Sequence, residues 1–183
     1  MYHNIRTTLY HGSISMIQKV DVSMGRGRKD FGKGFYMSVS KQQAIGMMHK
    51  KYREAKRRYF NSSKENFQEI LYQIELDKSK ISSMDIKIFE NANIEWLDFI
   101  LMCRKSNDVP HNYDLVIGPT ADDDTIYCLK RYYDGDYGNR NSFEAKKMLL
   151  KNLEVENLGI QYFIGKQEIA DTLIQSFIPL ERN

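Results

Sequence analysis

A glycine-rich stretch near the start of the chain is the first candidate for chemistry. Residues 27–33 match the first seven positions of a phosphate-binding P-loop, Gly-x-x-x-x-Gly-Lys. A P-loop continues with Ser or Thr, whose hydroxyl binds Mg²⁺, and then opens a helix. Here Gly34 follows, and residues 35–39 alternate like a short strand. We therefore reject a P-loop, and Asp30 stands where a dinucleotide fingerprint needs its third glycine.

Other common catalytic and metal-binding patterns are missing from the sequence. The chain has four histidines, no two of them at metal-ligand spacing: His3, His11, His49 and His111. No Gly-x-Ser-x-Gly elbow marks a serine hydrolase. The acidic run at residues 122–124 is expected to start a solvated helix, because calcium and magnesium sites need ligands at spaced positions. We therefore expect no metal.

Periodicity predicts interspersed strands and helices around these residues. Strands are expected at 7–10, 35–39, 70–76, 86–89, 113–119, 160–164 and 176–178. Helices are expected from the N-cap Ser40 to about Tyr59, from the cap Asn93 through 101, after a capping box at Asn141 and Glu144, and over 167–174. Because strands and helices do not alternate regularly, we predict a single α+β domain over residues 1–183.

Composition bounds the cellular setting. At 183 residues and 42% hydrophobic content the chain can bury one core. No apolar run has the length of a membrane span and the N-terminus has no signal-peptide core, so we expect a cytoplasmic protein without membrane contact. Cys103 and Cys128 form no Cys-x-x-Cys pair and are expected to be buried thiols.

Charge is unevenly distributed. A net charge of +3 is too small to indicate a nucleic-acid partner. Basic residues nevertheless gather on the first expected helix: Lys50, Lys51, Arg53, Lys56, Arg57 and Arg58. We expect a solvated helix face here, and the alternative is a surface for an acidic partner or a phosphate-bearing ligand.

Two stretches taken together give the strongest functional indication. Residues 9–13, Leu-Tyr-His-Gly-Ser, precede residues 31–38, Phe-Gly-Lys-Gly-Phe-Tyr-Met-Ser. In this order and at this interval they resemble the NAD-binding half of the ADP-ribosyltransferase superfamily, in the branch of poly(ADP-ribose) polymerases and diphtheria-type toxins. The whole chain resembles a bacterial family placed in that superfamily. The resemblance implies a split antiparallel β-sheet core with surrounding helices.

The resemblance also implies an NAD⁺ pocket. Gly12 lets its backbone approach the nicotinamide carboxamide, His11 can bond a ribose hydroxyl, and Tyr36 can stack on the positively charged nicotinamide. Gly32 and Gly34 permit the tight turn into the strand that aims Tyr36. The residues expected to bind NAD are Tyr10, His11, Gly12, Ser13, Gly34, Phe35 and Tyr36. The alternative is a hairpin with a core histidine and tyrosine.

A third catalytic position is expected on a late strand. Members of the superfamily commonly place a glutamate there, which holds a ribose hydroxyl beside an oxocarbenium-like transition state. The matching residue here is Gln161, which can form hydrogen bonds but brings no negative charge. The expected catalytic set is therefore His11, Tyr36 and Gln161, with Glu168 as a fallback carboxylate.

These expectations describe an NAD-dependent mono-ADP-ribosyltransferase, such as a toxin or effector, with NAD as substrate and a macromolecule as acceptor. Polymer synthesis is less expected, because Gln42 and Ile45 replace a carboxamide-binding serine and a second stacking tyrosine. The acceptor carries no readable motif, and an inhibitory partner protein is a further candidate partner. Two alternatives stay open: a non-catalytic module that binds NAD or ADP-ribose, and an NAD glycohydrolase with water as acceptor.

Overall fold

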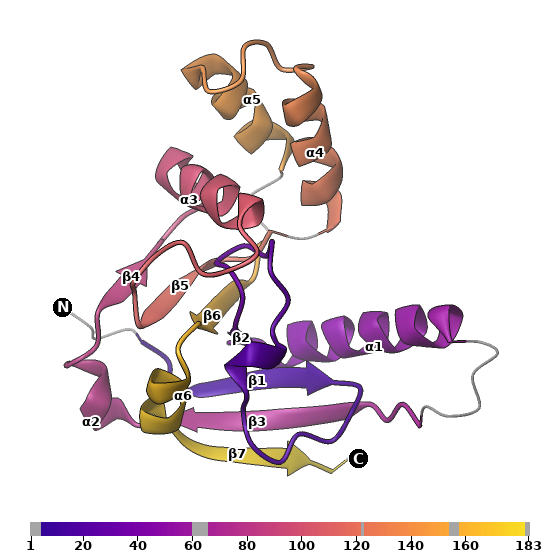
Figure 1. The fold of residues 1–183 in the computed structure, drawn as a ribbon, viewed down its shortest axis with the longest axis vertical. Helices are drawn as coiled ribbons and strands as arrows, with labels where there is room; N and C mark the ends of the chain where they lie inside the picture. Colours follow the sequence, from indigo (N-terminus) through magenta and orange to yellow (C-terminus); the bar gives the residue numbers. More distant parts are fainter. Residues whose placement is uncertain (1–4, 60–65, 122, 154–157, 182–183) are drawn as a thin grey trace.

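One mixed β-sheet forms the centre of the fold. The computed structural model describes residues 5–59, 66–121, 123–153 and 158–181. Within these segments the sheet has seven strands, in the spatial order β4 (Ile86–Ile88), β5 (Leu115–Pro119), β6 (Ile160–Ile164), β2 (Phe35–Ser38), β1 (Thr8–Ser13), β3 (Ile70–Leu76) and β7 (Ile174–Leu180) (Figure 1). The predicted α+β class is confirmed.

The sheet is narrow at its middle. β1 pairs with β3 over six residues and β2 pairs with β6 over four, but β1 and β2 meet through the single pair Tyr10–Ser38. All neighbouring strands run antiparallel except β4 and β5, which are parallel. Instead of two separate antiparallel sheets, the chain therefore has two sheet halves joined at one residue pair, which we call the β1–β2 junction.

Helices cover both faces of the sheet (Figure 1). On one face, α1 (Lys41–Arg58) packs on β1, β2 and β3, and α3 (Ile94–Lys105), α4 (Asp123–Asp134) and α5 (Phe143–Asn152) cover the half that contains β5 and β6. On the other face lie α2 (Lys78–Ile81), α6 (Gln167–Leu173) and the 3₁₀ helix η1 (Val22–Met24). We call these the α1 face and the α6 face.

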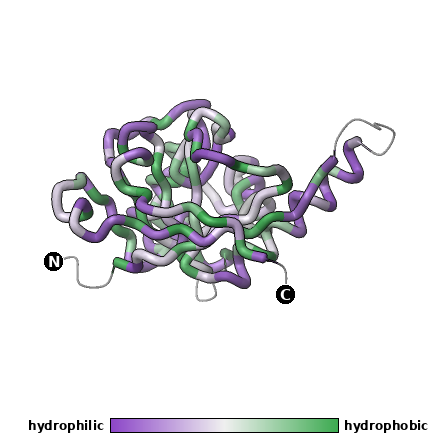
Figure 2. Tube along the Cα trace, turned by 90° about the horizontal axis from the view of Figure 1, so that it is seen from below, coloured by the Kyte–Doolittle hydropathy of each residue, from purple (hydrophilic) through white to green (hydrophobic). Residues whose placement is uncertain are grey.

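Alternation along the strands decides which side chains reach which layer. Leu9, Met37 and Ile74 are buried on the α6 face with residues of α2 and α6. Val116 and Phe163 point to the opposite face and pack under α3, α4 and α5 around the fully buried Trp96. The part of α1 that extends beyond the sheet is mostly hydrophilic (Figure 2).

Local capping signals were predicted with mixed success. Ser40 caps α1 by accepting from the Gln43 N–H, and Asn93 caps α3 by accepting from the Trp96 N–H, as predicted. The prediction for α5 was wrong by one residue, because Ser142 is the N-cap. Asn141 instead adopts a left-handed backbone with φ of 73° and donates its N–H to the hydroxyl of Tyr132.

The strands also differ from the predictions in detail. β1 extends to Ser13, so the His11-Gly12-Ser13 segment lies inside the strand and does not follow it. The glycine-rich stretch runs directly into the strand β2, as predicted, and not into a helix. The short helices α2 and η1 had no predicted counterpart. These elements are too short to show a periodic pattern.

Surface and thiol expectations can also be compared with the structure. Arg53, Lys56, Arg57 and Arg58 of α1 lie at the surface, with Lys56 5.4 Å from the ring centre of Tyr52. Lys50 is half-buried, and Lys51 turns its ammonium group toward the Gly12 carbonyl. Cys103 and Cys128 are both buried and free, as predicted, and burial raises the pKa of Cys103 to about 12. Within the described segments, no helix combines the length and apolar character needed to cross a membrane.

Two glycines allow a matched test of how closely α1 approaches the sheet. A Cβ on Gly12 would lie 2.4 Å from the Ala44 carbonyl oxygen and 2.6 Å from Met48 Cβ, whereas a Cβ on Gly46 would meet nothing within 4 Å. We expect Gly12→Ala to lower the free energy of unfolding by about 1–3 kcal/mol through overpacking. Gly46→Ala should raise it by about 1 kcal/mol, because Gly is a poor helix former. Urea unfolding of both variants checks this, and equal effects would contradict the close approach of α1.

Candidate functional site

His11 is held at the β1–β2 junction in one defined tautomer. Its Nδ1 lies 2.7 Å from the carbonyl oxygen of Tyr36, and its ring lies 4.6 Å from that of Phe35 between centroids. A carbonyl only accepts hydrogen bonds, so Nδ1 carries the hydrogen and Nε2 keeps its lone pair. Burial and the nearby positive charge of Lys51 lower the pKa of His11 to about 3. His11 is therefore a neutral imidazole that offers Nε2 as an acceptor.

Tyr36 anchors the glycine-rich loop, which we define as residues 25–34. Its hydroxyl donates to the Gly32 carbonyl at 2.7 Å and accepts from the Phe31 N–H at 3.0 Å. Its ring packs against Phe163 with centroids 4.9 Å apart. Burial and the negative charge of Asp30 raise its pKa well above the usual value. Gly32 suits this contact because its φ of 105° lies in the region that other residues avoid.

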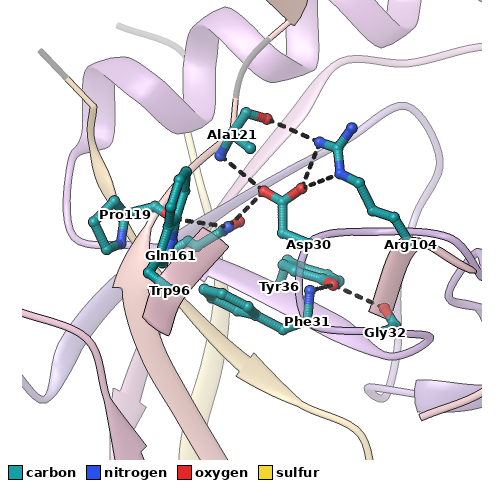
Figure 3. Close-up of polar contacts among 9 residues, drawn as sticks. All are labelled: Asp30, Phe31, Gly32, Tyr36, Trp96, Arg104, Pro119, Ala121 and Gln161. Carbon is teal, nitrogen blue, oxygen red and sulfur yellow. Dashed lines mark hydrogen bonds and ion pairs between the residues drawn. The ribbon is translucent and has the colours of Figure 1, made fainter. Parts of the chain in front are cut away.

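Gln161 is buried one strand away from Tyr36. It pairs with Ser38 across β2 and β6 and is 8% exposed. Its Nε2 donates to Oδ2 of Asp30 at 2.8 Å and lies 3.5 Å from the Pro119 carbonyl oxygen. The side chain expected to hold a ribose hydroxyl is thus fixed by a carboxylate from the glycine-rich loop (Figure 3).

Asp30 is the residue that sequence reasoning missed. It is 7% exposed, and Arg104 of α3 donates to its Oδ1 from Nε at 3.0 Å and from Nη2 at 2.6 Å. The Ala121 N–H donates to Oδ2 at 2.9 Å, beside the amide of Gln161 (Figure 3). We call these four residues the Asp30 network. No sequence motif signals it, because its partners are 74 to 131 positions away along the chain.

The structure brings the predicted catalytic residues near one another but on two faces. Side chains alternate along a strand, so His11 shares the α6 face with Phe35 and Tyr72, whereas Tyr36 and Gln161 point to the α1 face. His11 contacts the backbone of Tyr36 and not its ring. The structure therefore does not bring the three side chains together on one face, and the place where β1 and β2 diverge, beyond the pair Tyr10–Ser38, lies between His11 and Tyr36.

Gly12 and its neighbours line this divergence. The carbonyl of Gly12 accepts from Lys51 Nζ at 3.2 Å, and the direction of its missing Cβ is filled by α1. Burial and the nearby positive charges of Lys29 and Arg26 lower the pKa of Lys51. A ligand that donates to the Gly12 carbonyl would therefore share this oxygen with Lys51.

The remaining predicted binding residues have structural contacts of their own. Tyr10 is half-buried against α1, and Ser13 is buried with its hydroxyl donating to the Ser15 carbonyl at 2.8 Å. A Cβ on Gly34 would lie 2.4 Å from the Ile164 carbonyl oxygen, so this glycine lets the loop approach β6. Phe35 lies in the core of the α6 face.

Two surface hollows in the described part of the chain lie away from the predicted site. One of about 340 Å³ lies beside Val20, Ala170 and Phe177, and one of about 330 Å³ lies beside Lys33 and Val109. Neither is lined by His11, Tyr36 or Gln161. Over the described ranges, no three His, Cys, Asp or Glu side chains gather where they could hold a metal ion.

The fallback carboxylate Glu168 lies on the opposite side of the sheet from Gln161, and the acidic run at residues 122–124 begins outside the described residues. Glu168 lies in the first turn of α6, on the face opposite Gln161. Asp122 lies outside the described residues, and α4 begins at Asp123. Among the described acidic side chains, Asp30 is the one in hydrogen-bond contact with Gln161.

Comparison with known families places the chain in one of them. The family model described as "Protein of unknown function (DUF3990)" matches residues 7–174. The chain belongs to the DUF3990 family. No curated protein sequence matches it. The DUF3990 match includes His11, the glycine-rich loop and the whole Asp30 network, and it ends at the first residue of β7.

The tautomer of His11 predicts a specific pH dependence. The usual pKa of 6.5 applies to the unfolded chain and about 3 to the folded one, so the unfolded state takes up a proton first as pH falls. The stability that neutral His11 contributes is present above the unfolded pKa and is lost as pH falls toward the folded one. We expect the wild type to lose more unfolding free energy between about pH 7.5 and about pH 4.5 than His11→Asn, which keeps a donor but does not titrate.

Urea unfolding at the two pH values checks this prediction. His49→Asn is the matched control, since His49 lies on exposed α1 beside Glu69 and does not contact the junction. His49→Asn should still show the loss of unfolding free energy that His11 causes between the two pH values. Equal losses in His11→Asn and the wild type would show that His11 is not held neutral.

Proposed function

We propose that the chain is an NAD-dependent mono-ADP-ribosyltransferase that transfers one ADP-ribose unit to a macromolecular acceptor. The observation that supports this most is the linkage of His11, Tyr36 and Gln161. His11 bonds the Tyr36 carbonyl, the Tyr36 hydroxyl bonds Phe31, and the adjacent Asp30 bonds Gln161. Three residues matched to the superfamily by order alone thus belong to one connected set of contacts.

The sheet supports an ADP-ribosyltransferase-like fold within this proposal. Two antiparallel groups of strands, β1-β3-β7 and β2-β6-β5, meet through one residue pair. Beyond that pair the strands separate, so their facing backbone groups do not form a ladder with each other. The proposed NAD⁺ pocket lies at this divergence, between the two halves of the sheet.

The proposed roles follow from the observed hydrogen-bonding states. His11 Nε2 accepts a hydrogen bond from one ribose hydroxyl, and the amide oxygen of Gln161 accepts one from a second ribose hydroxyl. When the bond between C1′ and the nicotinamide nitrogen breaks, its electron pair leaves with nicotinamide and C1′ becomes positive. A nucleophile of the acceptor then bonds C1′ and releases its proton to solvent. The amide oxygen of Gln161, placed beside C1′, stabilises this positive charge through its dipole.

A non-catalytic module that binds NAD or ADP-ribose is the second candidate. It is favoured by the neutral amide of Gln161 and by the pairing of the Asp30 charge with Arg104, which leave the developing cation without a free carboxylate. An NAD glycohydrolase differs from the first candidate only in using water as acceptor.

We propose a cytoplasmic location for all three candidates, because the free buried thiols of Cys103 and Cys128 suit a reducing compartment.

Gln161→Ala separates binding from catalysis. We expect millimolar NAD⁺ to raise the melting temperature of the wild type, because a ligand that binds only the native state stabilises it. Gln161→Ala should bind NAD⁺ nearly as well but release nicotinamide at least about tenfold more slowly, as loss of one hydrogen bond in the transition state implies. Isothermal titration and a nicotinamide assay measure the two quantities.

Gln175→Ala is the matched control and should behave as the wild type. Gln175 is exposed on the edge strand β7, and three strands separate β7 from β6. Mass spectrometry of incubated protein mixtures then distinguishes transfer to an acceptor from hydrolysis. An unchanged melting curve with NAD⁺ would count against the pocket. Binding without any nicotinamide release would leave the non-catalytic module.

A further inference from the structure

The side-chain amide of Gln161 can face Asp30 in only one orientation. Asp30 Oδ2 lies 2.8 Å from the Gln161 amide, and a carboxylate only accepts hydrogen bonds. The NH₂ end of the amide must therefore face Asp30, and the oxygen Oε1 must face the other way. Among the described residues, none donates a hydrogen bond to Oε1. This oxygen is also not one of the buried polar atoms without a partner, so it keeps contact with solvent.

Asp30 is itself fixed from three directions. Its two oxygens take two donors each: Oδ1 from the Arg104 guanidinium, and Oδ2 from the Ala121 N–H and Gln161 Nε2. These donors come from α3, from the turn after β5 and from β6, so three elements of the fold meet at one carboxylate (Figure 3). With all four acceptor positions used, Asp30 has little freedom to rotate.

We infer that Asp30 is a positioning residue for the proposed reaction, which directs the Gln161 oxygen toward the ligand and makes glutamine the residue required at position 161. This inference rests on the proposed function for its catalytic consequence only. The orientation itself follows from the contacts. A glutamate at position 161 would place a second carboxylate oxygen about 2.8 Å from Asp30 Oδ2. Two carboxylates at that distance cannot both stay ionised.

A glutamate at position 161 should lower activity, although its charge alone would be expected to raise it. A carboxylate at position 161 would stabilise an oxocarbenium-like centre in isolation, but here it would repel Asp30 and turn away. The other groups near Asp30 do not relieve this repulsion. Arg104 already donates to Asp30 Oδ1 from both Nε and Nη2, so its charge is paired with one carboxylate. Burial raises the pKa values of Tyr36 and Cys103 and keeps both protonated. Q161E should therefore lose stability and activity together.

The test is a double-mutant cycle in the full chain with D30N, Q161E and D30N/Q161E. Melting temperature, NAD⁺ affinity, kcat and KM for nicotinamide release are measured for each. Q161E should melt below the wild type at neutral pH, and the difference should shrink on acidification as one carboxylate takes a proton. D30N/Q161E should recover at least about tenfold in kcat over Q161E, because the exchanged amide again faces a carboxylate. D30N alone should lower kcat while KM changes little.

Q161M is the matched control, since it keeps the length of the side chain without a charge. It should melt above Q161E at neutral pH and show no relief on acidification. If D30N lowers the melting temperature but leaves kcat at the wild-type value, Asp30 only supports the fold and the inference is overturned. Additive effects of D30N and Q161E on kcat would overturn it equally.

The inference and the proposed function can fail separately. If the wild type neither binds NAD⁺ nor releases nicotinamide, the proposed function fails, and the orientation of Gln161 is then judged from the melting temperatures. In that case a pH-dependent loss in Q161E that D30N/Q161E restores supports the orientation, and additive losses overturn it. If D30N alone does not fold, the pH dependence of Q161E against Q161M decides in the same way.

Discussion

A single buried carboxylate holds this structure together at its candidate site. Asp30 comes from a loop, yet it receives hydrogen bonds from α3, from the turn after β5 and from β6. Burying a charge is costly unless it is paired and bonded, and removing one partner of such a group costs more than the pair itself contributes. The glycine-rich loop, Arg104 and Gln161 therefore depend on one another for their positions.

This constraint explains the glycines that resemble a P-loop. The loop must fold tightly against the protein to bring Asp30 inside: Gly27 lies so close to Asn107 that a Cβ would be 2.4 Å from its carbonyl oxygen, and Gly32 turns the chain with a positive φ. Tyr36 then closes the loop by bonding Phe31 and Gly32. The glycines thus allow the loop to pack closely enough to bury a carboxylate.

Sequence patterns predicted what local interactions decide. Four elements were predicted because their periodicity or their capping residues involve only neighbouring positions in the sequence: β3, β6, α1 and α3. Asn141 and Ser142 can both cap a helix, and only the turn geometry selects Ser142. The Asp30 network was not predictable, because nothing local to Asp30 indicates Arg104 or Gln161. His11, Tyr36 and Gln161 were predicted as site residues from the resemblance, and their contacts could be known only from the tertiary structure.

The narrow β1–β2 junction sets what a ligand must do at this site. Beyond the pair Tyr10–Ser38, side chains donate to backbone carbonyls of both strands: His11 donates to that of Tyr36, and Lys51 donates to that of Gly12. The His11 contact fixes the tautomer and is compatible with a ligand at Nε2. The Lys51 contact uses one of the two lone pairs of the Gly12 carbonyl, so a ligand N–H that donates to the same oxygen would share it with an ammonium group. Lys51 lies near the like charges of Lys29 and Arg26, so positive charge gathers beside the Gly12 carbonyl, and this charge would attract a ligand that carries negative charge.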